Sequence, residues 1–222
     1  YFSGFSNSYM ADGMGGYDLL ARLSNSLKYA GVNPSGDASN WGCTARPITP
    51  LTSNRNMIDS AISQMIASGT TNIPIGVSWG VRILSPEEPF VEGAAWDDDE
   101  TIKAMVILTD GENVINGRSN INLSDYSGYG YAREGRLGVV TSSSNALGNA
   151  LDDRTAAACR HAQDQGIRVY TITFQVSSSS TRDMMRDCAT HPSLYFDSPS
   201  NAALRNAFEL IAGDLTNLRL AR

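Results

Sequence analysis

The sequence predicts an α/β fold in which helices flank a doubly wound, mostly parallel sheet. From residue 53 onward, segments with helical and strand-like spacing follow in the order α, α, β, α, β, α, β, α. The strand-like segment 104–108 is continuously apolar, which is typical of strands buried on both faces of a parallel sheet. The length of 222 residues, with 41% hydrophobic and 18% charged residues, suits one large globular domain.

Two regions are expected along the chain. Residues 1–52 are rich in Gly, Ser, Asn, Tyr and Pro and have little sustained periodicity, which favours an irregular segment lying on the surface. Residues 53–222 are expected to form the α/β domain. Its first helix is predicted over 53–69, with Ser53 as the cap, Gly69 as the stop, and one apolar face formed by Ile58, Ala61, Ile62, Met65 and Ile66.

A second helix is predicted within 73–86. Pro74 suits the first turn of a helix, and Pro86 ends the segment because proline cannot continue one. Gly76 and Gly80 lie four residues apart, on the same side of such a helix. They predict a flat stripe where this helix approaches a neighbour closely.

A Gly-, Ser- and Tyr-rich insertion over 112–145 follows the first strand. Loops of this length are usually functional or mobile. Its tyrosines Tyr126, Tyr129 and Tyr131 combine a large apolar ring with a polar tip. They predict either a contact surface for a partner or a loop that packs against its own domain.

The remaining pattern is helix, strand, helix, strand, helix. The segments are a helix over 147–165 stopped at Gly166, a strand within 167–176, a short helix over 181–189, a strand at 193–197 and a closing helix after the Ser200 cap. The first of these helices places Leu151, Thr155, Ala158 and Ala162 on one face. The last places Leu204, Phe208, Ile211, Leu215 and Leu218 on one face.

Composition excludes several classes of function. The formal net charge of −6 argues against nucleic acid as a partner, because phosphate binding needs a basic surface. The 2 histidines exclude a histidine-rich metal centre. No apolar run reaches the roughly 18 residues of a membrane helix. The start at Tyr1 has neither the charged beginning nor the apolar core of a signal peptide, so a fragment or a processed product is expected.

A carboxylate directly follows the first strand. Ligands of open parallel sheets bind beyond the carboxyl ends of the strands, and Asp110 lies at such an end, followed by Gly111, which allows a sharp turn. A hard divalent cation takes oxygen ligands, so Asp110 and Thr71, with Thr70 as an alternative, are candidate metal ligands. Mg²⁺ is the favoured ion, with Mn²⁺ or Ca²⁺ as alternatives. A plain Asp-Gly turn is the competing interpretation.

Several stretches carry a resemblance over roughly residues 40–222. They read VILTDGEN, TNIPIGVSWGVRILSP, GYGYAREGRLG, DDRTAAACRHAQDQGIRVYTITFQV and HPSLYFDSPSNAALRNAFELIA. Together they resemble a von Willebrand factor A (vWA) domain, and more closely the C-terminal part of TadG-like proteins of bacterial Flp-pilus assembly. The resemblance implies a doubly wound sheet, similar to a Rossmann fold, with a metal-ion-dependent adhesion site at its upper edge.

That site uses Asp-x-Ser-x-Ser after the first strand, a threonine in a later loop and an aspartate after the fourth strand. Asp110 matches the aspartate and Thr71 matches the threonine. The sequence departs from the pattern because it contains no Asp-x-Ser-x-Ser, and the first strands are missing. We therefore expect an N-terminal segment of the same protein to supply them, since the sheet would otherwise expose an edge and an apolar face.

The resemblance implies a metal-dependent protein-binding or adhesion module of the bacterial envelope, periplasmic or extracellular, which binds a carboxylate of a protein ligand. The alternative is a structural subunit of an extracellular assembly with a vestigial or empty metal site. An enzyme is not expected, because the sequence has neither a Gly-x-Ser-x-Gly elbow nor a phosphate-loop lysine.

The sequence has 3 cysteines. If consecutive strands are neighbours in the sheet, right-handed crossovers place the helices carrying Cys159 and Cys188 on the same face. This geometry predicts a disulfide between them in an oxidising compartment. Cys43 would then be left to bond with the missing segment. The alternative is three free, buried cysteines.

Overall fold

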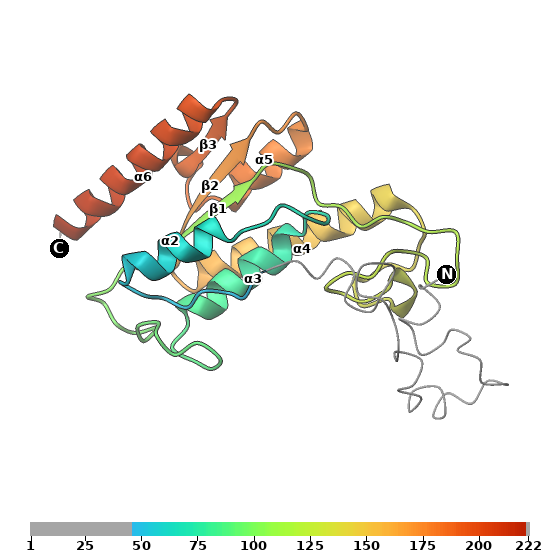
Figure 1. Ribbon diagram of the computed structural model, residues 1–222, viewed down its shortest axis with the longest axis horizontal. Helices are drawn as coiled ribbons and strands as arrows, with labels where there is room; N and C mark the ends of the chain where they lie inside the picture. Colours follow the sequence, from blue (N-terminus) through green and yellow to red (C-terminus); the bar gives the residue numbers. More distant parts are fainter. Residues whose placement is uncertain (1–45, 221–222) are drawn as a thin grey trace.

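The computed structural model describes residues 46–220, with side chains described as far as residue 217. The elements in chain order are α2 (Arg55–Ser63), α3 (Ile73–Leu84), β1 (Ala104–Thr109), η3 (Ala132–Glu134), α4 (Ser144–Asp164), β2 (Arg168–Phe174), α5 (Ser179–Cys188), η4 (Pro192–Leu194), β3 (Tyr195–Ser198) and α6 (Asn201–Leu220) (Figure 1). The predicted order of helices and strands is confirmed. Within the described residues, no helix combines the length and the apolar character needed to cross a membrane. Most of the predicted 1–52 segment, with Cys43, lies outside the described residues.

The strands form one parallel sheet in the order β1-β2-β3. Thr109 of β1 pairs with Thr173 of β2, which pairs with Asp197 of β3. The carboxyl ends of the strands therefore meet along one edge, where ligands of such sheets bind. Helices flank this sheet, so the described chain is an incomplete Rossmann-like α/β domain.

Helices cover the two faces unequally (Figure 1). On one face α3, α4 and α5 pack in a core of buried residues formed by Ile73, Val77, Val81, Met105, Cys159, Ala162, Ile167, Val169, Met185 and Cys188. On the other face α6 packs on β2 and β3 in a core of Tyr170, Ile172, Ala189, Leu194, Ala207 and Ile211. Consecutive parallel strands with both connecting helices on one face agree with right-handed crossovers.

The sheet is open at β1. On the α6 side, Val106 and Leu108 are 39% and 43% exposed, whereas their β2 partners Tyr170 and Ile172 are 0% exposed. No strand in the described part of the chain pairs with the outer edge of β1. The expected open edge and apolar face are therefore present.

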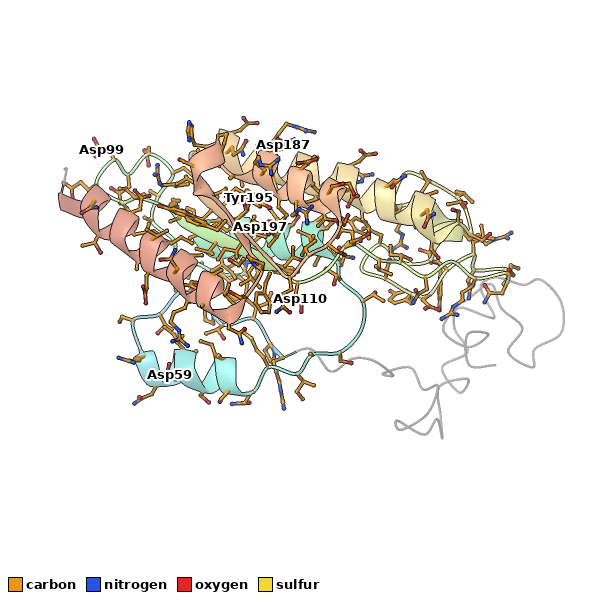
Figure 2. All side chains as sticks on the ribbon, turned by 90° about the horizontal axis from the view of Figure 1, so that it is seen from above. Asp59, Asp99, Asp110, Asp187, Tyr195 and Asp197 are labelled. Atoms are coloured by element: carbon orange, nitrogen blue, oxygen red, sulfur yellow. A yellow bond between two sulfur atoms is a disulfide. The ribbon has the colours of Figure 1, made fainter. Side chains whose placement is uncertain are left out.

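Helix α2 differs from its prediction at both ends. The cap is Asn54 rather than Ser53, because the Asn54 side chain accepts a hydrogen bond from the Met57 N–H. The helix ends at Ser63, so Met65 and Ile66 follow it instead of extending its apolar face. No residue of α2 is buried, and the helix, marked by Asp59 in Figure 2, stands apart from the sheet. An unpacked helix has no tertiary contacts to support further turns.

Helix α3 packs against the sheet through one of its two glycines. A Cβ at Gly80 would lie 2.9 Å from the Met105 sulfur and terminal methyl, so the absence of a side chain permits this close packing against β1. A Cβ at Gly76 would have no neighbour within 4 Å. The predicted glycine stripe therefore applies to Gly80 only.

The predicted disulfide joins α4 to α5. Cys159 and Cys188 are bonded, with their Cα atoms 5.1 Å apart, and both residues are buried. The bond crosses the core between two helices on the same face of the sheet. The crossover argument made from the sequence is thus confirmed for this pair.

The connection between α3 and β1 closes around one lysine. The Lys103 Nζ donates hydrogen bonds to the Leu84 carbonyl at 2.6 Å and to the Ala94 carbonyl. The same nitrogen lies 4.1 Å from the centre of the Trp96 ring. Burial lowers the pKa of Lys103, an effect partly opposed by the charge of Asp98.

The 112–145 insertion is ordered rather than structureless. Two isolated bridges, Gly117 to Ser124 and Ser127 to Gly130, lie within it, and it packs on the first turns of α4. Its core consists of the buried residues Ile115, Ala132, Leu137, Leu147, Ala150 and Leu151. Tyr129 and Tyr131 pack against their own domain, as the second alternative predicted. Of the three tyrosines, Tyr126 alone is exposed.

Candidate functional site

A tight turn at the end of β1 presents Asp110. The buried Thr109 hydroxyl donates to the Gly111 carbonyl at 2.8 Å and accepts from the Gly111 N–H at 3.3 Å. These two bonds fold the backbone around Asp110, whose side chain is exposed. No hydrogen bond or ion pair joins this carboxylate to another residue of the described chain. Asp110 is therefore available to a ligand.

Thr71 lies against the same turn. Its backbone carbonyl accepts a 3.0 Å hydrogen bond from the Val114 N–H. Its hydroxyl oxygen lies 3.4 Å from the position that a Cβ on Gly111 would occupy. The structure thus places the two best sequence candidates, Asp110 and Thr71, on adjoining segments. Thr70, the alternative, is exposed one residue earlier.

Asn113 holds these segments together, and sequence reasoning missed it. Its Oδ1 accepts from the Ile73 N–H at 2.8 Å, at the start of α3. Its Nδ2 donates to the Asp152 carboxylate at 2.8 Å and to the Thr155 hydroxyl at 3.0 Å, both on α4. One buried amide therefore fixes the β1 turn, α3 and α4. Its position two residues after Gly111, at the carboxyl edge of the sheet, is the signal that could have indicated it.

Negative charge gathers around this amide. Burial raises the pKa of Asp152, an effect opposed by the hydrogen bond from Asn113 and reinforced by Asp153 and Glu112. Glu112, which raises the pKa of Asp152 through its charge, is two residues from Asp110 in the chain. Such a local excess of negative charge favours the approach of a cation.

The donor set at Asp110 fits part of a magnesium site. Mg²⁺ prefers octahedral coordination by carboxylates, hydroxyls and waters, which needs about six oxygens. Asp110 and Thr71 supply one carboxylate and one hydroxyl. In the described part of the chain, no group of three His, Cys, Asp or Glu side chains is arranged to hold a metal. The other ligands would have to be waters, further hydroxyls or a different segment.

A separate cluster of polar side chains lies on the neighbouring strands β2 and β3. The Tyr195 and Thr173 hydroxyls lie 2.9 Å apart, and Thr173 donates to the Asp197 carboxylate at 3.2 Å. Figure 2 labels Tyr195, Asp197 and Asp110. Because β2 lies between β1 and β3, the backbones at Asp110 and Asp197 are about 10 Å apart.

Comparisons with known proteins give a limited likeness. No protein-family profile and no curated protein matches the sequence. The fold is similar to parts of two solved structures of the pilus adhesin SpaC from Lactobacillus rhamnosus GG. In one, the TM-score is 0.47 at 17% sequence identity, over 72% of this chain and 21% of the adhesin. In the other, an open conformation, the values are 0.46 and 20%, with the same coverage. This chain thus spans about a fifth of the adhesin, as the 21% coverage states.

Proposed function

We propose that this chain is part of a metal-ion-dependent protein-binding module in a TadG-like protein of the bacterial envelope. The observation that carries the proposal is that the exposed Asp110 carboxylate follows β1 at the carboxyl edge of the sheet, while the Thr71 hydroxyl lies against the adjacent Gly111. The resemblance of VILTDGEN and TNIPIGVSWGVRILSP to a vWA domain supports the same two ligands.

The proposed site works by sharing a cation with the partner. Asp110 and Thr71 would hold Mg²⁺, with Mn²⁺ or Ca²⁺ as alternatives, and the ion would keep one coordination position for a carboxylate of a protein ligand. Since hard cations bind oxygen and the site has only one described carboxylate, the ion retains enough charge to attract a second. Recognition would then depend on the cation, as expected for an adhesion role.

The N-terminal segment expected from the resemblance would complete the domain. It would add strands next to β1 and bring the Asp-x-Ser-x-Ser ligands to the same edge. The open edge of β1, with Val106 and Leu108 exposed beside it, supports this arrangement. Parallel sheets are normally covered on both faces.

The disulfide supports a location outside the cytoplasm. A Cys159–Cys188 bond persists in oxidising compartments, which in bacteria are the periplasm and the cell exterior. We therefore place the module in the bacterial envelope, periplasmic or extracellular, and propose that it binds rather than catalyses.

Thermal unfolding of the full-length protein with Mg²⁺ and with EDTA tests the proposal. A ligand present at about 100 times its Kd stabilises by about 2.7 kcal/mol, so Mg²⁺ should raise the Tm clearly. Asp110→Ala and Thr71→Ala should abolish the increase. Asp187→Ala, at an exposed position on α5, should leave it unchanged. If wild-type protein shows no metal-dependent shift, the metal-dependent function is wrong.

A second candidate is a structural subunit of an extracellular assembly with a vestigial site. It is favoured by the small donor set, because within residues 46–220 no three His, Cys, Asp or Glu side chains are grouped to hold a metal. This candidate predicts that Asp110→Ala changes neither the Tm in Mg²⁺ nor the assembly of the protein. The same melting experiment therefore separates the two functions.

A further inference from the structure

One aromatic side chain of the insertion projects into solvent. Tyr126 is 68% exposed, whereas its neighbour in space, Tyr131, is 4% exposed. The two rings meet edge to face, with centroids 5.1 Å apart and an interplanar angle of 69°. A buried ring therefore supports an exposed one.

The backbone on both sides of Tyr126 is fixed. Before it, the Asp125 carboxylate receives two hydrogen bonds from the Arg118 guanidinium, at 2.6 and 2.7 Å, and one from Asn116 at 3.0 Å. After it, Ser127 and Gly130 exchange backbone hydrogen bonds of 3.1 and 2.9 Å, which close a tight turn. Binding to Tyr126 would thus cost little conformational entropy, because the ring is held before a partner arrives.

This turn lies against the segment that carries Thr71. A Cβ on Gly128 would collide with the Ile75 side chain in the first turn of α3, and it would lie 4.0 Å from the Asn72 amide nitrogen. Asn72 directly follows Thr71 in the chain. The turn that begins after Tyr126 therefore lies next to the segment that carries Thr71.

We propose that Tyr126 is a binding residue of this site, and that its ring packs against an apolar side chain of the partner protein close to the carboxylate that reaches the cation. The inference rests on the proposed function. Exposed, rigidly held tyrosines supply large contact area at low entropic cost and are enriched among the residues that dominate binding energy. Because Asp125, the residue before Tyr126, is neutralised by its ion pair with Arg118, an apolar partner group is favoured over a charged one.

Random peptides displayed on phage provide the probe. The library is selected on full-length wild-type protein in Mg²⁺ and eluted with EDTA, and enriched peptides are synthesised for titration. Tyr126→Ala should weaken their binding at least about tenfold, as for other dominant interface residues. Tyr126→Phe, which keeps the ring, should bind within about threefold of wild type. Val140→Ala, at another exposed apolar position of the insertion, is the matched control and should bind like wild type.

The outcomes separate the inference from the function on which it rests. If EDTA releases no enriched peptide, or if Asp110→Ala binds the peptides as well as wild type, the metal-dependent function is wrong. If Asp110→Ala loses binding but Tyr126→Ala retains it, the role of Tyr126 alone is wrong. The Tm of each variant shows whether the fold is intact, and loss of binding by both Tyr126→Ala and Val140→Ala would also contradict a specific role for the ring.

Discussion

The Tyr170 hydroxyl donates a 2.6 Å hydrogen bond to the Asp214 carboxylate and thereby joins the central strand β2 to α6. Arg168 adds an ion pair of 2.8 Å to the same oxygen. The hydrogen bonds from Tyr170 and then Arg168 hold the pKa of Asp214 below its ordinary value. Asp214 is thus stabilised as a carboxylate in the folded protein.

This relationship predicts acid sensitivity. Because the folded-state pKa of Asp214 is depressed, its contribution is complete above the unfolded value of about 3.9 and is lost as the pH falls through the folded value. Asp214→Asn should therefore lower stability at pH 7 and flatten the decline below about pH 4. Urea unfolding at a series of pH values measures both. Asp183→Asn, whose Arg186 pair lies on the surface of α5, should leave the acid decline unchanged.

Removal of the disulfide should cost substantial stability. Cys159 and Cys188 are separated by 29 residues, and closing a loop of this size contributes about 3–4 kcal/mol in the chain-entropy model. The double variant Cys159→Ala, Cys188→Ala should lose this amount in urea unfolding. Reductant should destabilise the wild type and leave the double variant unaffected. Equal sensitivity of both proteins to reductant would contradict the pairing.

Asn113→Ala should remove the hydrogen bonds that connect the β1 turn to α3 and α4. The change leaves the Ile73 N–H without its side-chain acceptor and removes the donor to Asp152. Unsatisfied buried groups cost about 1–3 kcal/mol each, so a loss of roughly 2–3 kcal/mol is expected. Urea unfolding measures it. Asn116→Ala, which removes one half-buried bond to Asp125, is the control and should cost about 1 kcal/mol or less.

The two glycines of α3 should respond differently to alanine. Alanine is favoured over glycine inside a helix by about 1 kcal/mol, and a Cβ at Gly76 meets no atom within 4 Å, so Gly76→Ala should stabilise by about that amount. At Gly80 the Cβ would press on the Met105 side chain, so Gly80→Ala should gain less or lose stability. Thermal unfolding of both variants checks the order. A larger gain at Gly80 would refute the packing against β1.

Lysine substitutions can test whether the exposed face of β1 is covered in the full-length protein. In the full-length protein, an N-terminal segment covering this face would make Val106→Lys or Leu108→Lys destabilising by about 2 kcal/mol or more. On an uncovered face the same changes should stay within about 0.5 kcal/mol. Ile62→Lys, on the exposed side of α2, is the control. Chemical denaturation of the three variants therefore reports whether β1 has a neighbour.

The sequence predicts the order of elements well where apolar spacing is regular and the segment packs. Leu151, Thr155 and Ala162 were expected on one helical face, and all three are 0% exposed in α4. The ends of α2 could not be predicted, because Asn54 and Ser53 are both good caps and only the local backbone decides between them. The helix ends early because no residue of α2 is buried against the rest of the protein, and the local sequence does not reveal this lack of packing.

The candidate site was predictable only in part. Asp110 follows from its place after a buried strand, and Thr71 from its hydroxyl in the polar turn between two helices, with added support from the resemblance to vWA domains. Asn113 was missed because its partners Ile73, Asp152 and Thr155 are 40, 39 and 42 residues away, so its bonds exist only after the fold has formed. Whether the two ligands bind a cation is a prediction that the melting experiment addresses.

The enclosure of Lys103 has a practical consequence for labelling. Lys28 and Lys103 are the lysines of this sequence, and the amine of Lys103 is engaged by the Leu84 and Ala94 carbonyls and the Trp96 ring. Amine-reactive dyes should therefore react slowly at Lys103, the residue that directly precedes β1. A label on this amine would in any case lie at the opposite end of the strand from Asp110, because Lys103 precedes β1 and Asp110 follows it.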